Sequence, residues 1–170
     1  FVPAEQADLL KSELAYQNHV ATLSAYGALP RGPIHADLFR DNVMFESDAD
    51  GAPSLTGFFD FYFAGVDSWL FDIAVCLNDW CIDLSSGATD APRTKALIQA
   101  YESVRPLLAQ ERDLLPAAAR AGALRFWISR LWDLHLPREA AVLQAHNPDH
   151  FWRVLRQRIL YPLTITQATA

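Results

Sequence analysis

Residues 35–45 read HADLFRDNVMF, and residues 57–61 read GFFDF. In the first stretch Asp37 is followed five residues later by Asn42, just before an apolar run that favours a strand. A tight loop that leads into a strand can direct both polar groups into one cleft. A second aspartate, Asp60, ends the next apolar run and can arrive opposite Asn42 if the two runs form a hairpin. The two stretches therefore predict three oxygen-bearing side chains gathered at one site.

This combination of residues is typical of a site that transfers a phosphoryl group. Such a site needs one carboxylate to orient the attacking hydroxyl and accept its proton, and hard oxygen ligands to hold Mg²⁺ against the phosphates. The spacing H-x-D-x-x-x-x-N, followed by a hairpin and an aspartate in an apolar run, supplies both. In the alternative interpretation, His35 and Asp37 only close a turn and Asp60 only caps a strand. That alternative explains each residue singly but not the register of all of them.

The residues around these stretches predict a small β-ribbon. Short extended segments are expected around Ile34, at Val43–Phe45 and at Leu55–Phe59. The last two are joined by residues 47–53, SDADGAP, whose Asp, Gly and Pro residues are typical of a hairpin turn. The ribbon is therefore expected to carry both polar stretches.

Helices are predicted on both sides of the ribbon. The first is expected at residues 4–25, where leucines recur at helical intervals before Gly27 and Pro30. The segment Trp69–Leu84 is apolar nearly all round and is expected to form a helix buried in the centre of the domain. Further helices are expected from Thr89-Asp90 to Pro106, at Arg120–Leu136, and from Asn147-Pro148 onward, with Asn147 as the N-cap. The fold class is therefore α+β, mainly helical, in a single domain of residues 1–170.

Composition narrows the classes of partner. Of the 170 residues, 51% are hydrophobic and 20% charged, which excludes an intrinsically disordered chain. A net charge of −6 provides no positive field for nucleic acid, and the longest apolar stretch carries too many polar residues to cross a membrane. Cys76 and Cys81 have no further residues to complete a metal site and are interpreted as buried thiols. We expect a cytoplasmic protein with no nucleic-acid or membrane partner.

The stretch His35–Phe45 resembles the catalytic loop of the aminoglycoside-phosphotransferase-like kinases, whose usual form is H-G-D-x-x-x-x-N followed by apolar residues. Gly57–Phe61 resembles their metal-binding segment. Within this superfamily, residues 60–64 and 74–81 look most like the bacterial homoserine kinases that share its fold. The resemblance covers residues from about 30 to 160, and it implies the C-terminal lobe of a protein-kinase-like fold.

The resemblance also implies a role for each residue that matches the motif. Asp37 is expected to be the catalytic base or the group that orients the hydroxyl. Asn42 and Asp60 are expected to be the Mg²⁺ ligands. His35 and Asp72 are expected to organise the loop, His35 by hydrogen bonding and Asp72 by holding loop amides.

Two further residues are candidates for binding the substrate. Homoserine carries an ammonium group that Asp79 could bind and a carboxylate that Arg130 could bind. Asp72, Asp79 and Asp83 are expected to lie within about 40° of one helix face, so the more ordinary explanation of Asp79 is the solvated edge of a buried helix. The more ordinary explanation of Arg130 is a surface ion pair with Asp133 or Glu139.

The sequence departs from the family pattern in two places. Ala36 stands where the superfamily often has glycine, and we expect an ordinary backbone conformation there. The chain has only two lysines, Lys11 and Lys95, both in helical contexts, and none of its seven glycines forms a phosphate-cradling loop after a strand. The N-terminal lobe that clamps the nucleotide is therefore expected to be absent from this chain, which alone should bind ATP poorly.

The resemblance implies ATP-dependent phosphorylation of the hydroxyl of L-homoserine to O-phospho-L-homoserine, on the route to threonine, with Mg²⁺ and ATP. Another kinase of the superfamily stays open as an alternative, acting on choline, an aminoglycoside or a sugar. A choline kinase should show an aromatic cage for its cation, and an aminoglycoside kinase many acidic residues at the cleft. A non-catalytic binding remnant is the alternative from another class of protein.

Overall fold

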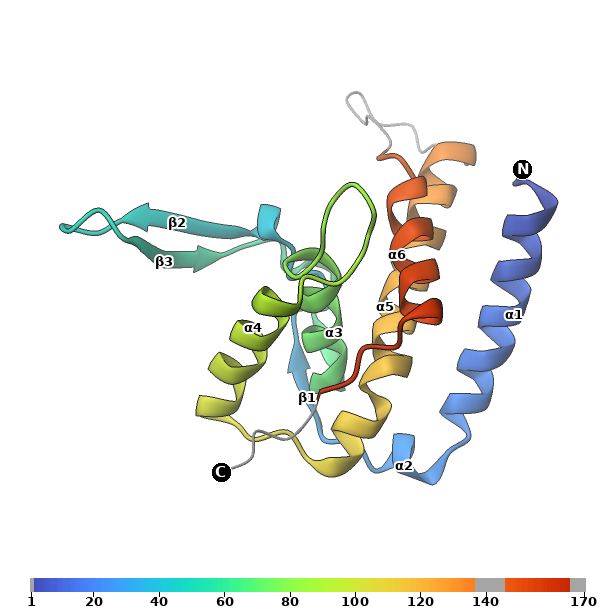
Figure 1. The fold of residues 1–170 in the computed structure, drawn as a ribbon, viewed down its shortest axis with the longest axis horizontal. Helices are drawn as coiled ribbons and strands as arrows, with labels where there is room; N and C mark the ends of the chain where they lie inside the picture. Colours follow the sequence, from blue (N-terminus) through green and yellow to red (C-terminus); the bar gives the residue numbers. More distant parts are fainter. Residues whose placement is uncertain (1, 137–145, 166–170) are drawn as a thin grey trace.

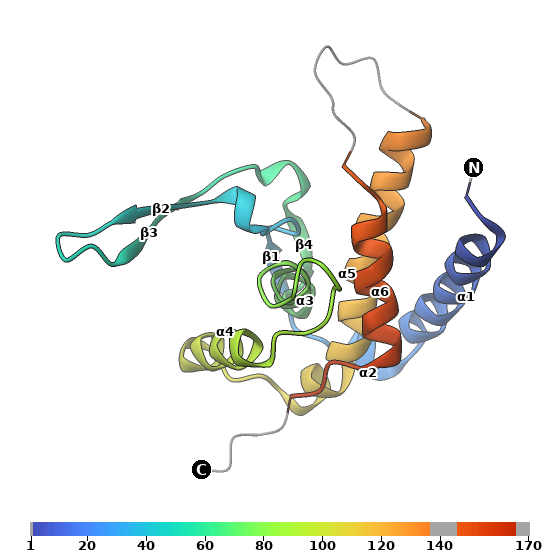
Figure 2. The ribbon, with the colours of Figure 1, turned by 45° about the horizontal axis from the view of Figure 1, so that its top comes forward.

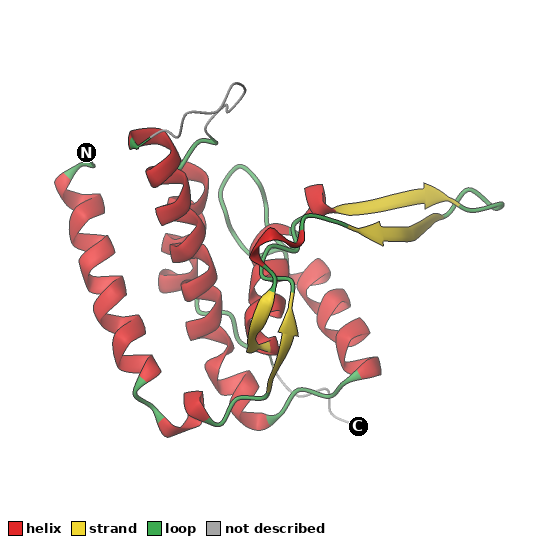
Figure 3. Cartoon of the chain, turned by 180° about the vertical axis from the view of Figure 1, so that it is seen from behind, coloured by secondary structure: helices red, strands yellow, loops and turns green. Residues whose placement is uncertain are grey.

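The computed structural model describes residues 2–136 and 146–165. Over these residues helices predominate and the strands are short, which confirms the predicted α+β class (Figure 3). The helices are α1 (Ala4–Ala21), α2 (Ser24–Gly27), α3 (Trp69–Asp79), α4 (Ala91–Val104), α5 (Ala109–His135) and α6 (Asp149–Leu160). The strands are β1 (Arg31–Ile34), β2 (Val43–Ser47), β3 (Pro53–Phe58) and β4 (Gly65–Ser68), with 3₁₀ turns η1 (Arg40–Asn42) and η2 (Phe61–Phe63).

Two antiparallel ribbons precede helix α3. Strand β2 pairs with β3 from Val43 opposite Phe58 to Ser47 opposite Pro53, which confirms the predicted hairpin. Figures 1 and 2 show this hairpin projecting away from the helices. Strand β1 pairs with β4, which was not predicted. Because β4 runs directly into α3, this pairing brings the loop after β1 close to that helix.

Helix α3 lies at the centre of the molecule, between α4 and α5 (Figures 1 and 2). Leu70, Ala74 and Leu77 of α3 are completely buried, as the apolar sequence predicted. Helix α5 packs against α1, α3 and α6. Trp127 of α5 and Val154 of α6 are also completely buried.

The predicted end of the central helix is wrong. Helix α3 stops at Asp79 rather than Leu84, and Asp83 lies in the following loop. There the Asp83 carboxylate accepts hydrogen bonds from the backbone amides and hydroxyls of Ser85 and Ser86, which lower its pKa to about 2. These local bonds compete with continuation of the helix. Asp83 therefore does not share a helix face with Asp72 and Asp79.

The other helix boundaries are also partly revised. Helix α5 begins at Ala109, not at residue 120, and it contains Pro116 in its interior. The first predicted helix is divided into α1 and the short α2. Helix α6 begins one residue later than expected, although the Asn147 side chain still accepts a hydrogen bond from the amide of Asp149 at 2.8 Å. Helix α4 lies within its predicted segment but begins at Ala91, after Asp90 as its N-cap, and ends at Val104.

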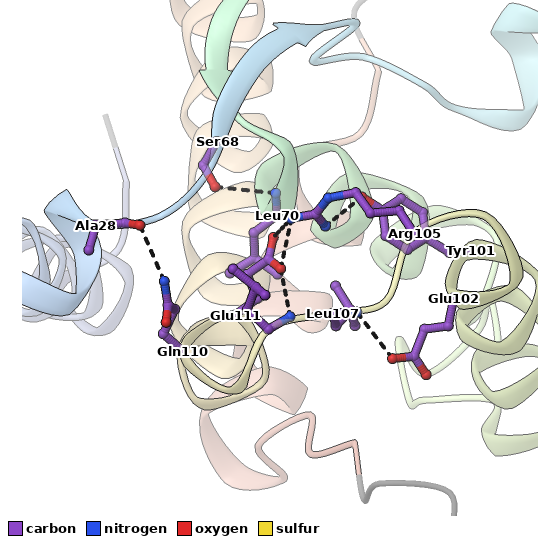
Figure 4. A network of polar contacts seen from close by, with 10 residues as sticks. Ala28, Ser68, Leu70, Tyr101, Glu102, Arg105, Leu107, Gln110 and Glu111 are labelled. Carbon is purple, nitrogen blue, oxygen red and sulfur yellow. Dashed lines mark hydrogen bonds and ion pairs between the residues drawn. The ribbon is translucent and has the colours of Figure 1, made fainter.

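A buried ion pair fixes the start of α5 (Figure 4). The completely buried carboxylate of Glu111 accepts two hydrogen bonds of 2.9 Å from Arg105 and a third from the amide of Leu108. The Arg105 guanidinium also lies 4.7 Å from the ring centre of Trp69, the first residue of α3. The connection between α4 and α5 is thereby held against the start of the central helix.

Candidate active site

The loop that follows β1 lies along one face of α3. The carboxylate of Asp72 accepts hydrogen bonds from the backbone amides of His35 at 2.8 Å and Ala36 at 2.7 Å. The carbonyl oxygen of Leu38 accepts a hydrogen bond from the indole N–H of Trp80 at 3.0 Å. Arg40 donates to the carboxylate of Asp79. The helix side of this contact comes from Asp72 and Asp79, seven residues apart on one face of α3, and from Trp80, which directly follows the helix.

Ala36 has a left-handed backbone conformation, with φ of +64°. The expectation of an ordinary conformation at this position is therefore wrong. The two amide bonds to Asp72 hold the chain in this geometry, and Arg125 of α5 donates to the carbonyl oxygen of Ala36 from the other side. A glycine would adopt the same φ without the steric cost that a Cβ atom imposes.

The hairpin is joined to the loop through Phe59, the residue before Asp60. The amide of Phe59 donates to the carbonyl oxygen of Asn42 at 3.2 Å. The carbonyl oxygen of Phe59 lies 3.0 Å from Nε2 of His35, and because a carbonyl can only accept, Nε2 carries the hydrogen. Asp60 itself is left-handed, with φ of +60°, a conformation that aspartate tolerates better than most residues.

Asn42 is oriented by Asp37. Its side-chain NH₂ donates to the backbone carbonyl of Asp37 at 2.7 Å, and the same nitrogen lies 3.4 Å from the Asp37 carboxylate. With the NH₂ group committed to Asp37, the amide oxygen is the atom that Asn42 can offer to a cation.

The predicted catalytic residues converge on one cavity of about 450 Å³. It is lined by Asp37, Phe39, Asp41, Asn42, Asp60, Tyr62, Phe63, Phe126, Ser129, Arg130, Asp133 and His146. His35 and Asp72 are outside this lining, where they contact the loop backbone. Asp79 is outside it too, and an ammonium group would reach its carboxylate only in competition with Arg40.

Charge is distributed unevenly around the cavity. Burial raises the pKa of Asp37, the guanidinium of Arg125 opposes this rise, and the carboxylate of Asp60 adds to it. Burial lowers the pKa of Arg130, which the carboxylates of Asp79 and Asp37 oppose. A partly buried arginine therefore faces the same space as Asp37 and could bind an anionic group there.

The side chains present fit a Mg²⁺ ion held together with phosphates. Within residues 2–136 and 146–165, no three His, Cys, Asp or Glu side chains cluster to hold a metal ion by themselves. A site made of the Asp60 carboxylate and the Asn42 amide oxygen is nonetheless what Mg²⁺ uses in phosphotransferases, because the ion takes its other ligands from phosphates and water.

Two arginines at this site had no predicted role. Arg125 binds the loop at Ala36 and lies 4.6 Å from the ring centre of Phe126. Arg40 was part of the quoted motif, but only the fold brings it to Asp79. The sequence signal for Arg125 was its position between Leu124 and the aromatic pair Phe126-Trp127, where an unpaired charge is costly.

The profile of the Phosphotransferase enzyme family matches residues 2–109, more than half of the chain. The chain belongs to this family. The match includes the loop, the hairpin and α3 of the phosphotransferase fold, whereas Arg125 and Arg130 lie beyond it. It agrees with the resemblance seen in residues 35–45 and 57–61.

The curated relatives that this chain matches include homoserine kinases of several bacteria. A homoserine kinase of Polaromonas naphthalenivorans (strain CJ2) is 63% identical over 162 residues, which are 95% of this chain and 50% of that protein. A homoserine kinase of Cupriavidus taiwanensis is 57% identical over 159 residues, 94% of this chain and 48% of that protein. The chain thus spans about half the length of the curated relatives it matches. No helix in the described part of the chain has the length and apolar character needed to cross a membrane.

Proposed function

We propose that this chain is the catalytic half of an ATP-dependent kinase that phosphorylates the side-chain hydroxyl of L-homoserine to O-phospho-L-homoserine. The observation that carries the proposal is the convergence of Asp37, Asn42, Asp60 and Arg130 on one cavity, in a chain 63% identical to a homoserine kinase. The reaction breaks the bond between the γ-phosphorus of ATP and its bridging oxygen, and forms a bond from phosphorus to the homoserine oxygen. ADP leaves, and the hydroxyl proton is released to a base.

Asp37 is the base in this proposal. Its carboxylate lines the cavity and is oriented by its contact with Asn42, so it can align the hydroxyl and accept its proton. The rise in its pKa caused by burial makes it a better proton acceptor than a solvated aspartate. His35 and Asp72 hold the loop that carries it.

Asn42 and Asp60 are the proposed Mg²⁺ ligands, and Arg130 the proposed partner of the homoserine carboxylate. Bound Mg²⁺ would neutralise charge on the phosphates of ATP. The guanidinium of Arg130 is held 4.4 Å from the ring centre of Phe151, which limits its freedom and suits it to binding a planar carboxylate.

We propose that a lobe outside this chain completes the nucleotide-binding site. Four apolar side chains of the hairpin are about half exposed: Met44 (50%), Phe45 (52%), Leu55 (48%) and Phe58 (48%). The hairpin projects away from the helices, as Figures 1 and 2 show, so a second lobe can pack against it and enclose ATP. The half-length match to the relatives supports this arrangement.

The test is phosphoryl transfer by the enzyme extended upstream to include the proposed nucleotide lobe. With Mg-ATP and homoserine we expect ADP release and phosphohomoserine detected by ³¹P NMR. Asp37→Asn should lower kcat by about 10²–10⁴-fold, the range typical of general-base catalysis. Asp83→Asn, which alters an exposed carboxylate outside the cavity, is the matched control.

Each other result has a defined meaning. ADP release with choline, an aminoglycoside or a sugar, but not with homoserine, would retain the phosphotransferase mechanism and refute the substrate. No ADP release with any acceptor would support a non-catalytic remnant. An Asp37→Asn variant with unchanged kcat would remove Asp37 from the mechanism.

A further inference from the structure

Asp79 and Arg40 form a three-point contact beside the cavity. The backbone amide of Arg40 donates to Oδ2 of Asp79 at 2.9 Å, Nε donates to the same oxygen at 3.0 Å, and Nη2 donates to Oδ1 at 3.1 Å. The Asp79 side chain is 13% exposed and that of Arg40 is 35% exposed. A bidentate arginine–carboxylate pair with an added backbone bond is much stronger and more directional than an exposed ion pair.

The position of Arg40 within the loop gives this contact its importance. Arg40 is the first residue of η1, the turn that ends at Asn42. Hydrogen bonds within the loop join its parts: the amide of Phe39 donates to the carbonyl of Asp37 at 2.8 Å, and the amide of Asn42 donates to the carbonyl of Phe39 at 3.0 Å. Fixing the backbone at Arg40 therefore restrains Asp37 on one side and Asn42 on the other.

Two carboxylates of helix α3 thus hold backbone amides of the loop, and between these amides the carbonyl oxygen of Leu38 accepts hydrogen bonds from Cys76 and Trp80. Asp72 holds the amides of residues 35 and 36, and Asp79 holds the amide of residue 40. The two aspartates are seven residues apart, which on a helix is about 10 Å along one face. Asp37 lies between the two attachment points, so its placement depends on both.

We propose that Asp79 is a positioning residue that, through Arg40, fixes the segment from Asp37 to Asn42 for phosphoryl transfer. The positioning role of Asp79 rests on the proposed function, because the reaction it serves is the proposed phosphoryl transfer. The attachment of the loop to Asp79 can be tested without turnover. Asp79 is then no substrate ligand, in contrast to the ammonium-binding role that the sequence suggested.

The first arm of the test is kinetic and uses the upstream-extended enzyme. Asp79→Asn should lower kcat at least ten-fold, because a displacement of about 1 Å at a reacting group can cost about 10²-fold in rate. The KM for homoserine and that for ATP should stay within about two-fold of wild type. Asp83 is the next aspartate along the chain, and its carboxylate accepts hydrogen bonds from Ser85 and Ser86, away from the loop; Asp83→Asn should leave kcat unchanged.

Arg40→Gln is the partner variant. Because the Arg40 side chain is more exposed than that of Asp79, this substitution should disturb folding less. It should lower kcat in the same way with KM retained. The double variant Arg40→Gln/Asp79→Asn should be little worse than the more impaired single variant, because both changes break the same contact. Effects that multiply would show that the two residues act separately and would overturn the proposal.

The second arm measures amide hydrogen exchange in the same enzyme and needs no turnover. In Asp79→Asn the amides of Phe39, Arg40 and Asn42 should lose at least ten-fold in protection, while amides of buried α5 keep theirs. Loss at Arg40 alone, with Phe39 and Asn42 still protected, would overturn the proposal because the loop would not depend on the contact.

Two further outcomes separate this proposal from the proposed function. A raised KM for homoserine with unchanged kcat in Asp79→Asn would identify Asp79 as a substrate ligand and overturn the positioning role. A wild-type enzyme inactive with every acceptor would refute the proposed function alone, and the exchange measurement would still decide whether Asp79 holds the loop.

Discussion

At the scale of single residues, the site depends on two left-handed positions that bracket the proposed chemistry. Ala36 precedes Asp37 with φ of +64°, and Asp60 has φ of +60°. A residue with a Cβ atom is strained in this region, and such strain persists only where surrounding bonds determine the backbone. At Ala36 these bonds come from Asp72 on one side and Arg125 on the other.

Replacing Ala36 by glycine should stabilise the fold. The left-handed conformation costs an alanine roughly 1–2 kcal/mol, and the extra freedom of glycine in the unfolded chain offsets about 0.5–1 kcal/mol of the relief. We expect Ala36→Gly to raise the free energy of unfolding by about 0.5–1 kcal/mol, measured by urea denaturation.

The same substitution in a helix is the matched control. Ala15 is exposed in the middle of α1, and Ala15→Gly should lower the free energy of unfolding by about 1 kcal/mol. If both variants lost stability to the same degree, Ala36 would carry no backbone strain.

At the scale of elements, helix α3 combines two tasks. Leu70, Ala74 and Leu77 are completely buried in the core, while Asp72 and Asp79 hold the loop. The helix is thus a rigid support whose position is set by packing, and the loop takes its geometry from that support. Any element that fixes the position of α3 therefore also fixes the position of the loop at the candidate site.

Helix α6 fixes α3 through a buried arginine. Arg158 is 1% exposed, and burial lowers its pKa to about 10. It donates to the side chain of Asn78 at 2.8 Å, to the hydroxyl of Thr89 at 2.6 Å and to the carbonyl of Leu77 at 3.4 Å. These contacts join α6 to the end of α3 and to the loop that follows it.

Removing this side chain should destabilise the protein strongly. Arg158→Ala leaves buried polar groups of Asn78 and Thr89 without their partner and creates a cavity, so we expect a loss of about 3 kcal/mol or more in the free energy of unfolding. Chemical denaturation followed by circular dichroism measures it.

Arg156 on the same helix is the control. Its side chain is 48% exposed and its guanidinium lies 4.0 Å from Glu5, so Arg156→Ala should change the free energy of unfolding by no more than about 0.5 kcal/mol. Similar losses in the two variants would mean that the buried contacts of Arg158 contribute no more to the free energy of unfolding than an exposed ion pair does.

At the scale of the whole molecule, the chain has a packed helical core and an apolar hairpin that projects from it (Figure 1). The cavity is lined by the loop, by residues 60–63 after the hairpin and by α5, and these segments carry the residues proposed to bind the metal and the acceptor. The sequence predicts no phosphate-cradling loop among the seven glycines of this chain. Nucleotide binding is therefore proposed to require the second lobe.

The chain alone should respond little to nucleotide. If its Kd for Mg-ATP exceeds the ligand concentration, the linkage gain is below about 0.4 kcal/mol and the Tm should shift by no more than about 1–2 °C. Thermal melting with and without Mg-ATP measures this, and the upstream-extended enzyme is the positive control. A shift of several degrees in the chain alone would contradict the requirement for a second lobe.

The sequence by itself determined what depends on local spacing and composition. The pattern from His35 to Asn42, the turn at residues 47–53 and the second aspartate at Asp60 predicted the hairpin and a shared site, because alternation and turn residues act over a few positions. The apolar character of α3 predicted its central burial, because the composition of one segment is also a local property.

Only the tertiary structure decided which distant groups meet. Four features depend on such meetings: the left-handed Ala36, the pairing of β1 with β4, the bond from Arg125 to the loop and the Asp79–Arg40 contact. The residues that these contacts join are 31 to 89 positions apart. No local pattern encodes such meetings, since they follow from how α3 and α5 pack. The helix end at Asp79 was missed because hydrogen bonds to Asp83 outweighed an apolar pattern that continues to Leu84.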